Sequence, residues 1–196
     1  MHWLEKAVEL EPRNAEAWYF LGRAYYTRSR ISEAKAAFGK VLQLNPKDAR
    51  AENNLGLVLE SEAHPSEAIE AFQQAIAWQQ ASQKRSEQPY LNLGGVFLDE
   101  GRNEEALPVL EEAVKLAPTN SLCRLKLGIA YLRLSKLESA RPELEEAARL
   151  DPENAAAHFQ LGKLYKQMRL MDRAQKEFHR AEEIQGRAAA APKPNP

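Results

Sequence analysis

The residues best able to do chemistry in this sequence are four histidines and one cysteine. They are His2, His64, His158, His179 and Cys123. A zinc site needs three or four convergent ligands, and a third ligand is not indicated beside His158 and His179, which fall in the last stretch of the chain. Cys123 has no evident base to generate a thiolate, so we interpret it as a small packing residue. The sequence therefore predicts no metal and no catalytic residue.

Motifs that bind cofactors or activate nucleophiles do not occur either. Gly162-Lys163 lacks the upstream glycine of a phosphate-binding loop, and neither H-E-x-x-H nor G-x-S-x-G is present. We predict no cofactor and no enzymatic activity for this chain.

The charge balance limits the classes of partner. Of 196 residues, 27 are Lys or Arg and 28 are Asp or Glu, which gives a net charge of −1. This balance produces no overall field that would attract nucleic acid or an anionic membrane. No apolar run approaches the ~20 residues of a membrane span, and the first residues, MHWLEKAVEL, are unlike a secretory signal. The single cysteine leaves the compartment open, with the cytoplasm slightly favoured.

The elements that would position these residues repeat along the chain. The pair Leu-Gly recurs with its glycine at positions 22, 56, 94, 128 and 162, at intervals of 34, 38, 34 and 34 residues. An alanine follows each glycine by 12 residues, and a Phe or Leu follows that alanine by four. Such a period is the signature of a repeat protein.

Each unit has the pattern of two helices. In the first helix, Trp18, Leu21 and Tyr25 are apolar residues at helical spacing. The second helix follows a polar turn such as Gly101-Arg102-Asn103, and acidic residues in its first turn interact favourably with the helix dipole. We expect the glycine of the first helix and the alanine of the second to mark the point where the pair packs most closely.

This pattern resembles the tetratricopeptide repeat (TPR) family, whose signature joins an aromatic residue, Leu-Gly, Tyr, Ala, Phe and Pro over about 34 residues. Residues 15–48, AEAWYFLGRAYYTRSRISEAKAAFGKVLQLNPKD, match at nearly every landmark. The first aromatic position is occupied by Glu52, Arg124 and His158 in three later units. The resemblance implies an all-α fold, a right-handed α-solenoid of stacked antiparallel helix pairs.

The predicted boundaries follow from the repeat register. A single array covers 1–188, with a half repeat at 1–14, repeats at 15–48, 49–82, 87–120, 121–154 and 155–188, a four-residue insertion at 83–86, and a flexible Ala/Pro tail at 189–196. The half repeat lacks its first helix and no capping helix is evident at either end. The chain is therefore interpreted as a segment of a longer protein or as a module whose ends pair with another copy.

The family resemblance also implies a binding groove, lined by the first helices, for a peptide from another protein. Repeat positions 2, 5, 6, 9, 12 and 13 would face it. The candidate peptide-binding residues are Tyr19, Arg23, Tyr26, Asn53, Asn54, Leu91, Asn92, Lys126, Arg133, Lys163 and Lys166. Asn54 and Asn92 occupy the same place in successive units, where an amide can grip a peptide backbone, or they are inherited consensus residues.

The cationic residues of the last two repeats suggest the character of the peptide. Lys126, Arg133, Lys163 and Lys166 would favour an acidic peptide or a terminal carboxylate, or else form an ordinary solvated face. The residue set by which chaperone-binding TPR domains clamp a carboxylate is incomplete here.

The junction WQQASQKRSEQPY, residues 78–90, is four residues longer than the junctions between the other repeats. Its Gln, Ala, Lys and Arg are good helix formers, so we predict that the second helix runs about one turn further than its siblings, with residues 79–86 exposed. Trp78 would fill the altered junction. The extra length is either neutral or a secondary docking point.

The leading functional hypothesis is a non-catalytic module that binds a partner peptide in its groove and scaffolds an assembly. The alternatives are a regulatory or substrate-recruiting arm of a larger enzyme, and a structural module that self-associates through its uncapped terminal repeats. The sequence does not name the partner, organism or pathway.

Overall fold

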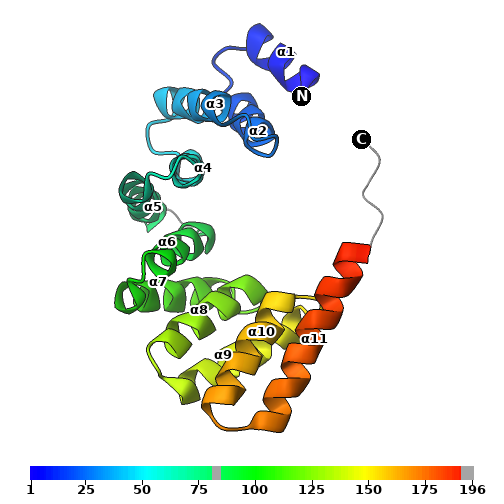
Figure 1. Ribbon diagram of the computed structural model, residues 1–196. Coiled ribbons are helices and arrows are strands. Elements are labelled where there is room, and N and C mark those ends of the chain that lie inside the picture. The colour runs from blue at the N-terminus through cyan, green and yellow to red at the C-terminus, as the bar shows by residue number, and fades with distance from the viewer. Residues whose placement is uncertain (81–84, 191–196) are drawn as a thin grey trace. The chain divides into compact units, whose positions relative to one another are not determined.

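The computed structural model describes residues 1–80 and 85–190, which form eleven helices and no strand (Figure 1). The helices are α1 His2–Leu10, α2 Ala15–Tyr26, α3 Ile31–Leu44, α4 Ala49–Ser61, α5 Pro65–Gln80, α6 Gln88–Asp99, α7 Asn103–Leu116, α8 Ser121–Arg133, α9 Leu137–Leu150, α10 Ala155–Gln167 and α11 Met171–Ala190. The predicted all-α class is confirmed.

The chain divides into two compact units. Unit 1 is Met1–Val96 and unit 2 is Phe97–Pro196. Unit 1 holds α1 to α5 and most of α6. In this unit α1 packs on α2, α2 on α3, α3 on α4 and α4 on α5. In unit 2, α7 to α11 do the same.

Helices pair in both units because short turns reverse the chain. The turns that follow α2, α4, α8 and α10 each contain one residue with positive φ, which are Ser29, Ala63, Ser135 and Arg169. The amide of the next residue donates to a carbonyl five residues back, as Arg30 N does to Tyr25 O at 3.0 Å. This arrangement ends one helix and directs the next antiparallel to it.

Asparagine or aspartate begins four of the first helices. The side chains of Asn14, Asp48, Asn120 and Asn154 accept hydrogen bonds from backbone amides in the first turns of α2, α4, α8 and α10. Each lies two residues after the proline of a turn such as LEPRNA. These N-caps explain why first helices begin at Ala15, Ala49, Ser121 and Ala155.

Glycine marks a close approach within four of the helix pairs, as expected. A Cβ on Gly22 would lie 2.7 Å from the ring of Phe38, and one on Gly56 would lie 2.5 Å from the ring of Phe72. In unit 2, Gly128 faces Leu144 in the same way at 2.6 Å. The repeat period therefore records a packing requirement between the two helices of a unit.

This close approach makes Gly56→Ala a destabilising substitution. The added methyl group would collide with the Phe72 ring, and overpacking of this kind costs about 1–3 kcal/mol. Gly39→Ala is the matched control because nothing lies within 4 Å of a Cβ at Gly39 in α3. There the higher helix propensity of alanine should stabilise unit 1 by up to about 1 kcal/mol. Urea unfolding followed by circular dichroism measures both, and equal midpoints for the two variants would contradict this contact.

The long junction after α5 differs from its prediction at Gln79. α5 ends at Gln80, two residues past Trp78, and residues 81–84, where the predicted extra turn would continue, lie outside the described residues. Gln79 is 5% exposed, so the prediction of an exposed side chain there was wrong. Its amide is held inward because it exchanges two hydrogen bonds with the backbone of Ser86, at 2.9 and 3.0 Å.

The C-terminal boundary also moves. α11 continues to Ala190, so residues 189 and 190 are helical and the predicted tail begins too early. Residues 187–190 are Arg-Ala-Ala-Ala, which are strong helix formers. Positions 191–196 of that tail lie outside the described residues.

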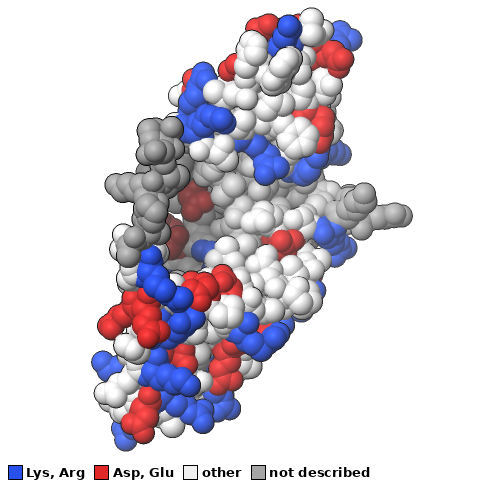
Figure 2. All heavy atoms as spheres, turned by 90° about the vertical axis from the view of Figure 1, so that its right-hand side faces the viewer, with Lys and Arg blue, Asp and Glu red and all other residues white. Residues whose placement is uncertain are grey.

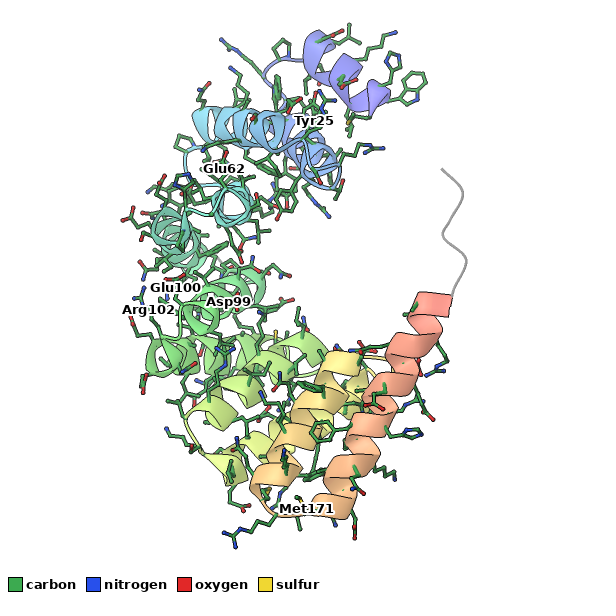
Figure 3. The ribbon with its side chains drawn as sticks, in the orientation of Figure 1. Tyr25, Glu62, Asp99, Glu100, Arg102 and Met171 are labelled. Atoms are coloured by element: carbon green, nitrogen blue, oxygen red, sulfur yellow. The ribbon has the colours of Figure 1, made fainter. Side chains whose placement is uncertain are left out.

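At the other end, α1 packs on α2 through one face only. Val8 is buried, and Tyr25 of α2 (Figure 3) donates from its hydroxyl to Glu5 Oε1 at 3.2 Å. Trp3 and Leu10 are 79% and 74% exposed. The apolar residues of α1 are thus only partly covered in unit 1.

Candidate functional site

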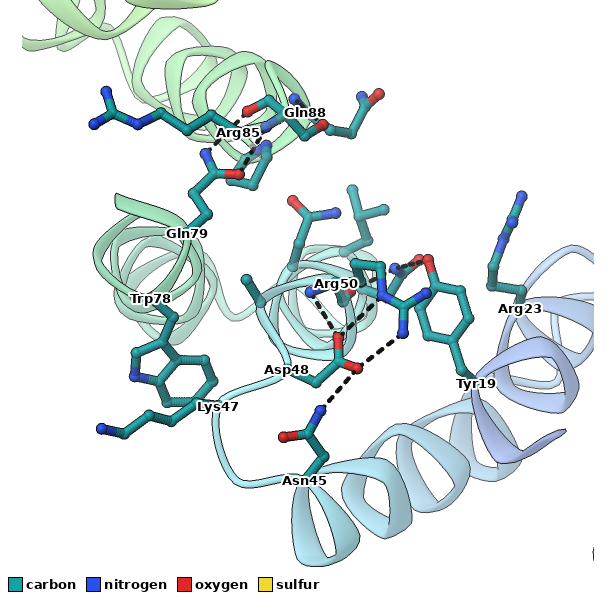
Figure 4. Close-up of a pocket in the computed structure, with 16 residues that line it drawn as sticks. Tyr19, Arg23, Asn45, Lys47, Asp48, Arg50, Trp78, Gln79, Arg85 and Gln88 are labelled. Atoms are coloured by element: carbon teal, nitrogen blue, oxygen red, sulfur yellow. Dashed lines mark hydrogen bonds and ion pairs between the residues drawn. The ribbon is translucent and has the colours of Figure 1, made fainter. Parts of the chain in front are cut away.

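The clearest hollow in unit 1 has a volume of about 870 Å³ (Figure 4). It is lined by α2, the α3–α4 connection, α4, the end of α5, residues 85–86 and the start of α6. Four predicted groove residues contribute to its wall, namely Tyr19, Arg23, Asn53 and Asn54. Its size is within the range of ordinary ligand pockets.

A charge cluster at the start of α4 forms one wall of the hollow. The Arg50 guanidinium donates to both carboxylate oxygens of Glu16 at 3.2 and 2.9 Å, and to Asp48 Oδ2 at 3.0 Å. Its carbon lies 4.6 Å from the centre of the Tyr19 ring. The Glu16 and Asp48 carboxylates raise the pKa of Arg50 further above its ordinary value.

Asp48 is buried in this cluster and stays ionised. Burial acts to raise its pKa, but hydrogen bonds from the Arg50 side chain and from the amides of Ala51 and Arg50 outweigh that effect. The pKa of Asp48 is therefore lowered. The cluster has a structural role, since it fixes the start of α4 against α2.

Asn54 and Asn92, the two asparagines predicted to grip a peptide backbone, both form hydrogen bonds with residues of unit 1. Asn54 Nδ2 donates to Arg50 O at 2.7 Å and to the Tyr19 hydroxyl at 3.3 Å. Asn92 Nδ2 donates to Asn53 Oδ1 at 2.9 Å. Because Asn53 is only 5% exposed, it links α4 to α6 and offers little surface to a ligand.

The other predicted residues of unit 1 vary in access. Leu91 and Tyr19 are 2% and 9% exposed, so both are mainly core residues. Tyr26 is half-buried, its hydroxyl donates to Leu57 O at 3.5 Å, and burial raises its pKa. Arg23 is exposed beside Tyr19, with 5.9 Å between its guanidinium carbon and the ring centre.

In unit 2, two predicted cations are exposed and two are partly engaged. Lys163 and Lys166 are exposed on α10, and Lys163 Nζ lies 6.0 Å from the ring centre of Phe159, which is 47% exposed. Lys126 is half-buried, and Arg133 donates from its guanidinium to the carbonyl oxygen of Leu98. The face of α10 therefore offers two exposed ammonium groups, and that of Lys163 lies near an exposed aromatic ring.

Sequence reasoning missed several residues that line the unit 1 hollow. Lys47, Trp78, Gln79 and Arg85 all contribute to its wall. The available signal was the longer junction itself, because Trp78 is its first residue and Arg85 belongs to its inserted residues.

His158 and Cys123 contribute to packing between elements of the fold. His158 Nδ1 lies 2.7 Å from Glu177 Oε2 and its Nε2 lies 3.2 Å from Pro152 O, which ties α10 to α11 and to the preceding turn. Cys123 is buried. Across residues 1–80 and 85–190, no group of three or more His, Cys, Asp or Glu side chains is arranged to hold a metal ion.

The surface carries both signs of charge, and no described helix is long and apolar enough to cross a membrane. Figure 2 shows Lys and Arg interspersed with Asp and Glu over the visible face.

Comparison with known families explains the repeat. Models described as tetratricopeptide repeat match residues 15–48, 65–121, 97–146 and 155–187, and one described as TPR repeat matches residues 130–168. The chain belongs to the tetratricopeptide repeat family. The TPR assignment agrees with the helix pairs and with the glycine contacts within them.

Two curated TPR relatives match parts of the chain. The type IV pilus assembly protein PilF of Pseudomonas aeruginosa is 33% identical over 98 residues, which is 50% of this chain and 37% of PilF. The human protein O-mannosyl-transferase TMTC3 is 30% identical over 117 residues, which is 57% of this chain and 12% of TMTC3. The chain thus spans a minor part of the length of either relative.

Solved structures share the TPR fold. The structure of Pseudomonas aeruginosa PilF has a TM-score of 0.77 at 26% identity, covering 89% of this chain and 78% of that one. YrrB has a TM-score of 0.72 at 22% identity, covering 93% and 92%, and MamA has 0.72 at 24%, covering 87% and 97%. The YrrB and MamA likenesses show the fold alone.

Proposed function

We propose that this TPR chain is a non-catalytic interaction module that binds a peptide segment of a partner protein along its first helices and so scaffolds an assembly. The observation that carries this proposal is the unit 1 hollow, which contains Tyr19, Arg23, Asn53 and Asn54 of the predicted set.

The face of α10 in unit 2 supports the same function. Phe159 presents an exposed ring, and Lys163 and Lys166 are exposed at helical spacing from it. An aromatic ring beside cations suits a peptide that carries both an apolar and an acidic side chain.

The relatives support an interaction role without defining the partner. PilF is named for type IV pilus assembly, and YrrB is described as a TPR protein with an unusual peptide-binding site. A TPR solenoid binds by presenting a surface, so one fold serves many partners.

Site-specific photocrosslinking tests the binding face. A photoreactive phenylalanine analogue in place of Phe20 or Phe159, which are 44% and 47% exposed on first helices, is expected to capture a partner protein from cell lysate. The matched controls are the same analogue at Trp3 in α1 and at Met171 (Figure 3), which is 56% exposed at the start of the second helix α11. Adducts of equal yield at all four positions, or adducts at the control positions alone, would rule out the first-helix face.

Two other functions each have one supporting observation. The exposed Trp3 and Leu10 of α1 favour self-association, which light scattering at several concentrations would detect as a rising mass. The match to 12% of TMTC3 favours a recruiting arm of a larger enzyme, which reading the parent open reading frame would establish.

A further inference from the structure

We propose that the unit 1 hollow forms a binding site for an acidic peptide segment, whose carboxylates are received by Arg23, Lys47 and Arg85. This inference rests on the proposed function and defines the chemistry of one partner segment. Its cations are different residues from the four that the sequence indicated in the last two repeats.

The charge on the wall of the hollow favours an anion. Among the described residues, four cations line it together with one acid, Asp48, which is 7% exposed. Arg50 is neutralised by Asp48 and Glu16. The remaining three cations are exposed, and none has a carboxylate within ion-pair distance in the described part of the chain. With Glu16 counted beside Asp48, four cations and two carboxylates leave a local excess of two positive charges, and a ligand meets the three cations outside the Arg50 cluster.

The inserted residues place one of these cations. Arg85 belongs to the four extra residues 83–86, so the shorter junctions have no equivalent. The buried Gln79 amide holds the adjacent Ser86 by two backbone hydrogen bonds, which anchors the chain where Arg85 emerges (Figure 4). The longer junction thus adds a positive group to the edge of the hollow.

The walls also offer an apolar surface. Trp78 is half-buried and lines the hollow together with the buried Pro89. Figure 4 shows Trp78 and Lys47 on one side of the hollow and Tyr19 and Arg23 on the other. A short segment with an apolar residue flanked by carboxylates therefore fits both the charges and the indole surface.

A peptide fits this charge distribution better than a nucleic acid does. Nucleic-acid binding relies on many phosphate contacts spread along a basic surface. Here three cations outside the Arg50 cluster surround a hollow of about 870 Å³, on a chain of net charge −1. The local field therefore favours a few carboxylates in a short segment.

Titration with a defined peptide tests the site. The probe is a fluorescein-labelled hexapeptide with a central leucine flanked by Asp and Glu, followed by fluorescence anisotropy with the full chain. The variant Arg23→Gln/Lys47→Gln/Arg85→Gln is expected to raise its Kd about tenfold or more, because it removes charge-assisted hydrogen bonds. A peptide in which Asn and Gln replace every acid should bind at least about tenfold more weakly than the acidic probe.

The matched control removes the same charge elsewhere in unit 1. Lys6→Gln/Arg13→Gln/Arg28→Gln also replaces one lysine and two arginines, all exposed and outside the hollow. Its Kd should change by less than about twofold at physiological salt, since screening weakens distant charges. An equal loss of affinity in both triple variants would overturn the proposal, because the effect would then be that of net charge.

Two further outcomes would overturn the site while leaving the proposed function intact. One is an unchanged Kd in the pocket variant together with loss of binding in Lys163→Gln/Lys166→Gln, which would place the acidic segment on α10. The other is tighter binding of a single-stranded oligonucleotide of the same charge than of the peptide. Photocrosslinking at Phe20 and Phe159 reports on the first-helix face in either case, so failure of this site and failure of the proposed function are distinguishable.

Discussion

Replacement of Phe72 by alanine is expected to lower the free energy of unfolding of unit 1 by about 3–5 kcal/mol. Phe72 is 0% exposed, and its ring fills the space left by Gly56 on the facing helix. Alanine removes the ring and leaves a cavity between α4 and α5. That cavity resists collapse because the start of α4 is held by the Asp48 cap and by the ion pair of Arg50 with Glu16.

The loss of stability should be local. In repeat proteins each repeat contacts only the repeats beside it. A destabilising substitution therefore acts first on its own helix pair. Hydrogen exchange should therefore accelerate most in α4 and α5 and least in α10 and α11. Urea unfolding measures the total effect, and exchange followed by mass spectrometry measures its distribution.

Phe20→Ala is the matched control for this prediction. Phe20 lies in the same unit but is 44% exposed, so its removal should cost at most about 1 kcal/mol. A Phe72→Ala variant no less stable than Phe20→Ala, or uniform exchange across both units, would contradict the packing argument.

The repeat register could be predicted from sequence because the same packing contact recurs from repeat to repeat. Gly22 and Gly56 recur where Phe38 and Phe72 need room, and the same spacing returns at Gly128 and Leu144. A constraint that recurs in each unit produces a period that one sequence reveals without knowledge of the structure.

The use of individual groove residues was harder to predict. Repeat position places Asn53 and Leu91 on first helices, but it does not tell which neighbour each side chain meets. Asn53 is paired with Asn92, and Leu91 is 2% exposed, since both depend on the residues of the adjacent repeat. These contacts between repeats are particular to each junction and leave no period in the sequence.

The long junction shows the limit of local propensity. Gln, Lys and Arg predicted about one extra helical turn with exposed side chains at residues 79–86, yet Gln79 is buried. The buried Gln79 amide satisfies the backbone of Ser86 through side-chain hydrogen bonds, which a propensity scale does not include. The positive φ of Ser29 and Arg169 could not be predicted either. A positive φ is usually expected where the sequence has a glycine, as at Gly101.

Replacement of Asp48 by alanine is expected to destabilise unit 1 by about 2–3 kcal/mol, which combines the loss of an N-cap with the loss of charged hydrogen bonds. The Asp48 carboxylate accepts from the amides of Arg50 and Ala51 at 3.0 and 3.1 Å and from the Arg50 guanidinium. Asp48→Asn separates the two roles. Asparagine caps α2, α8 and α10 in this chain, so it should preserve the cap and lose only the ionic part, about 1 kcal/mol.

The stability of wild type and of Asp48→Asn at low pH shows how much the charge of Asp48 contributes. Because hydrogen bonds hold its native pKa below the ordinary value, its charge stabilises the fold fully above the ordinary pKa of about 3.9. That contribution is lost as the pH falls from there through the lowered native pKa. Glu52, whose pKa is raised by burial, acts in the opposite sense but is present in both chains and cancels in their difference. The gap in urea midpoint between wild type and Asp48→Asn should therefore be constant from about pH 7 to about pH 5 and close below about pH 4. A gap that persists unchanged into strong acid would contradict this prediction, because the difference between the two chains would then not depend on the charge of Asp48.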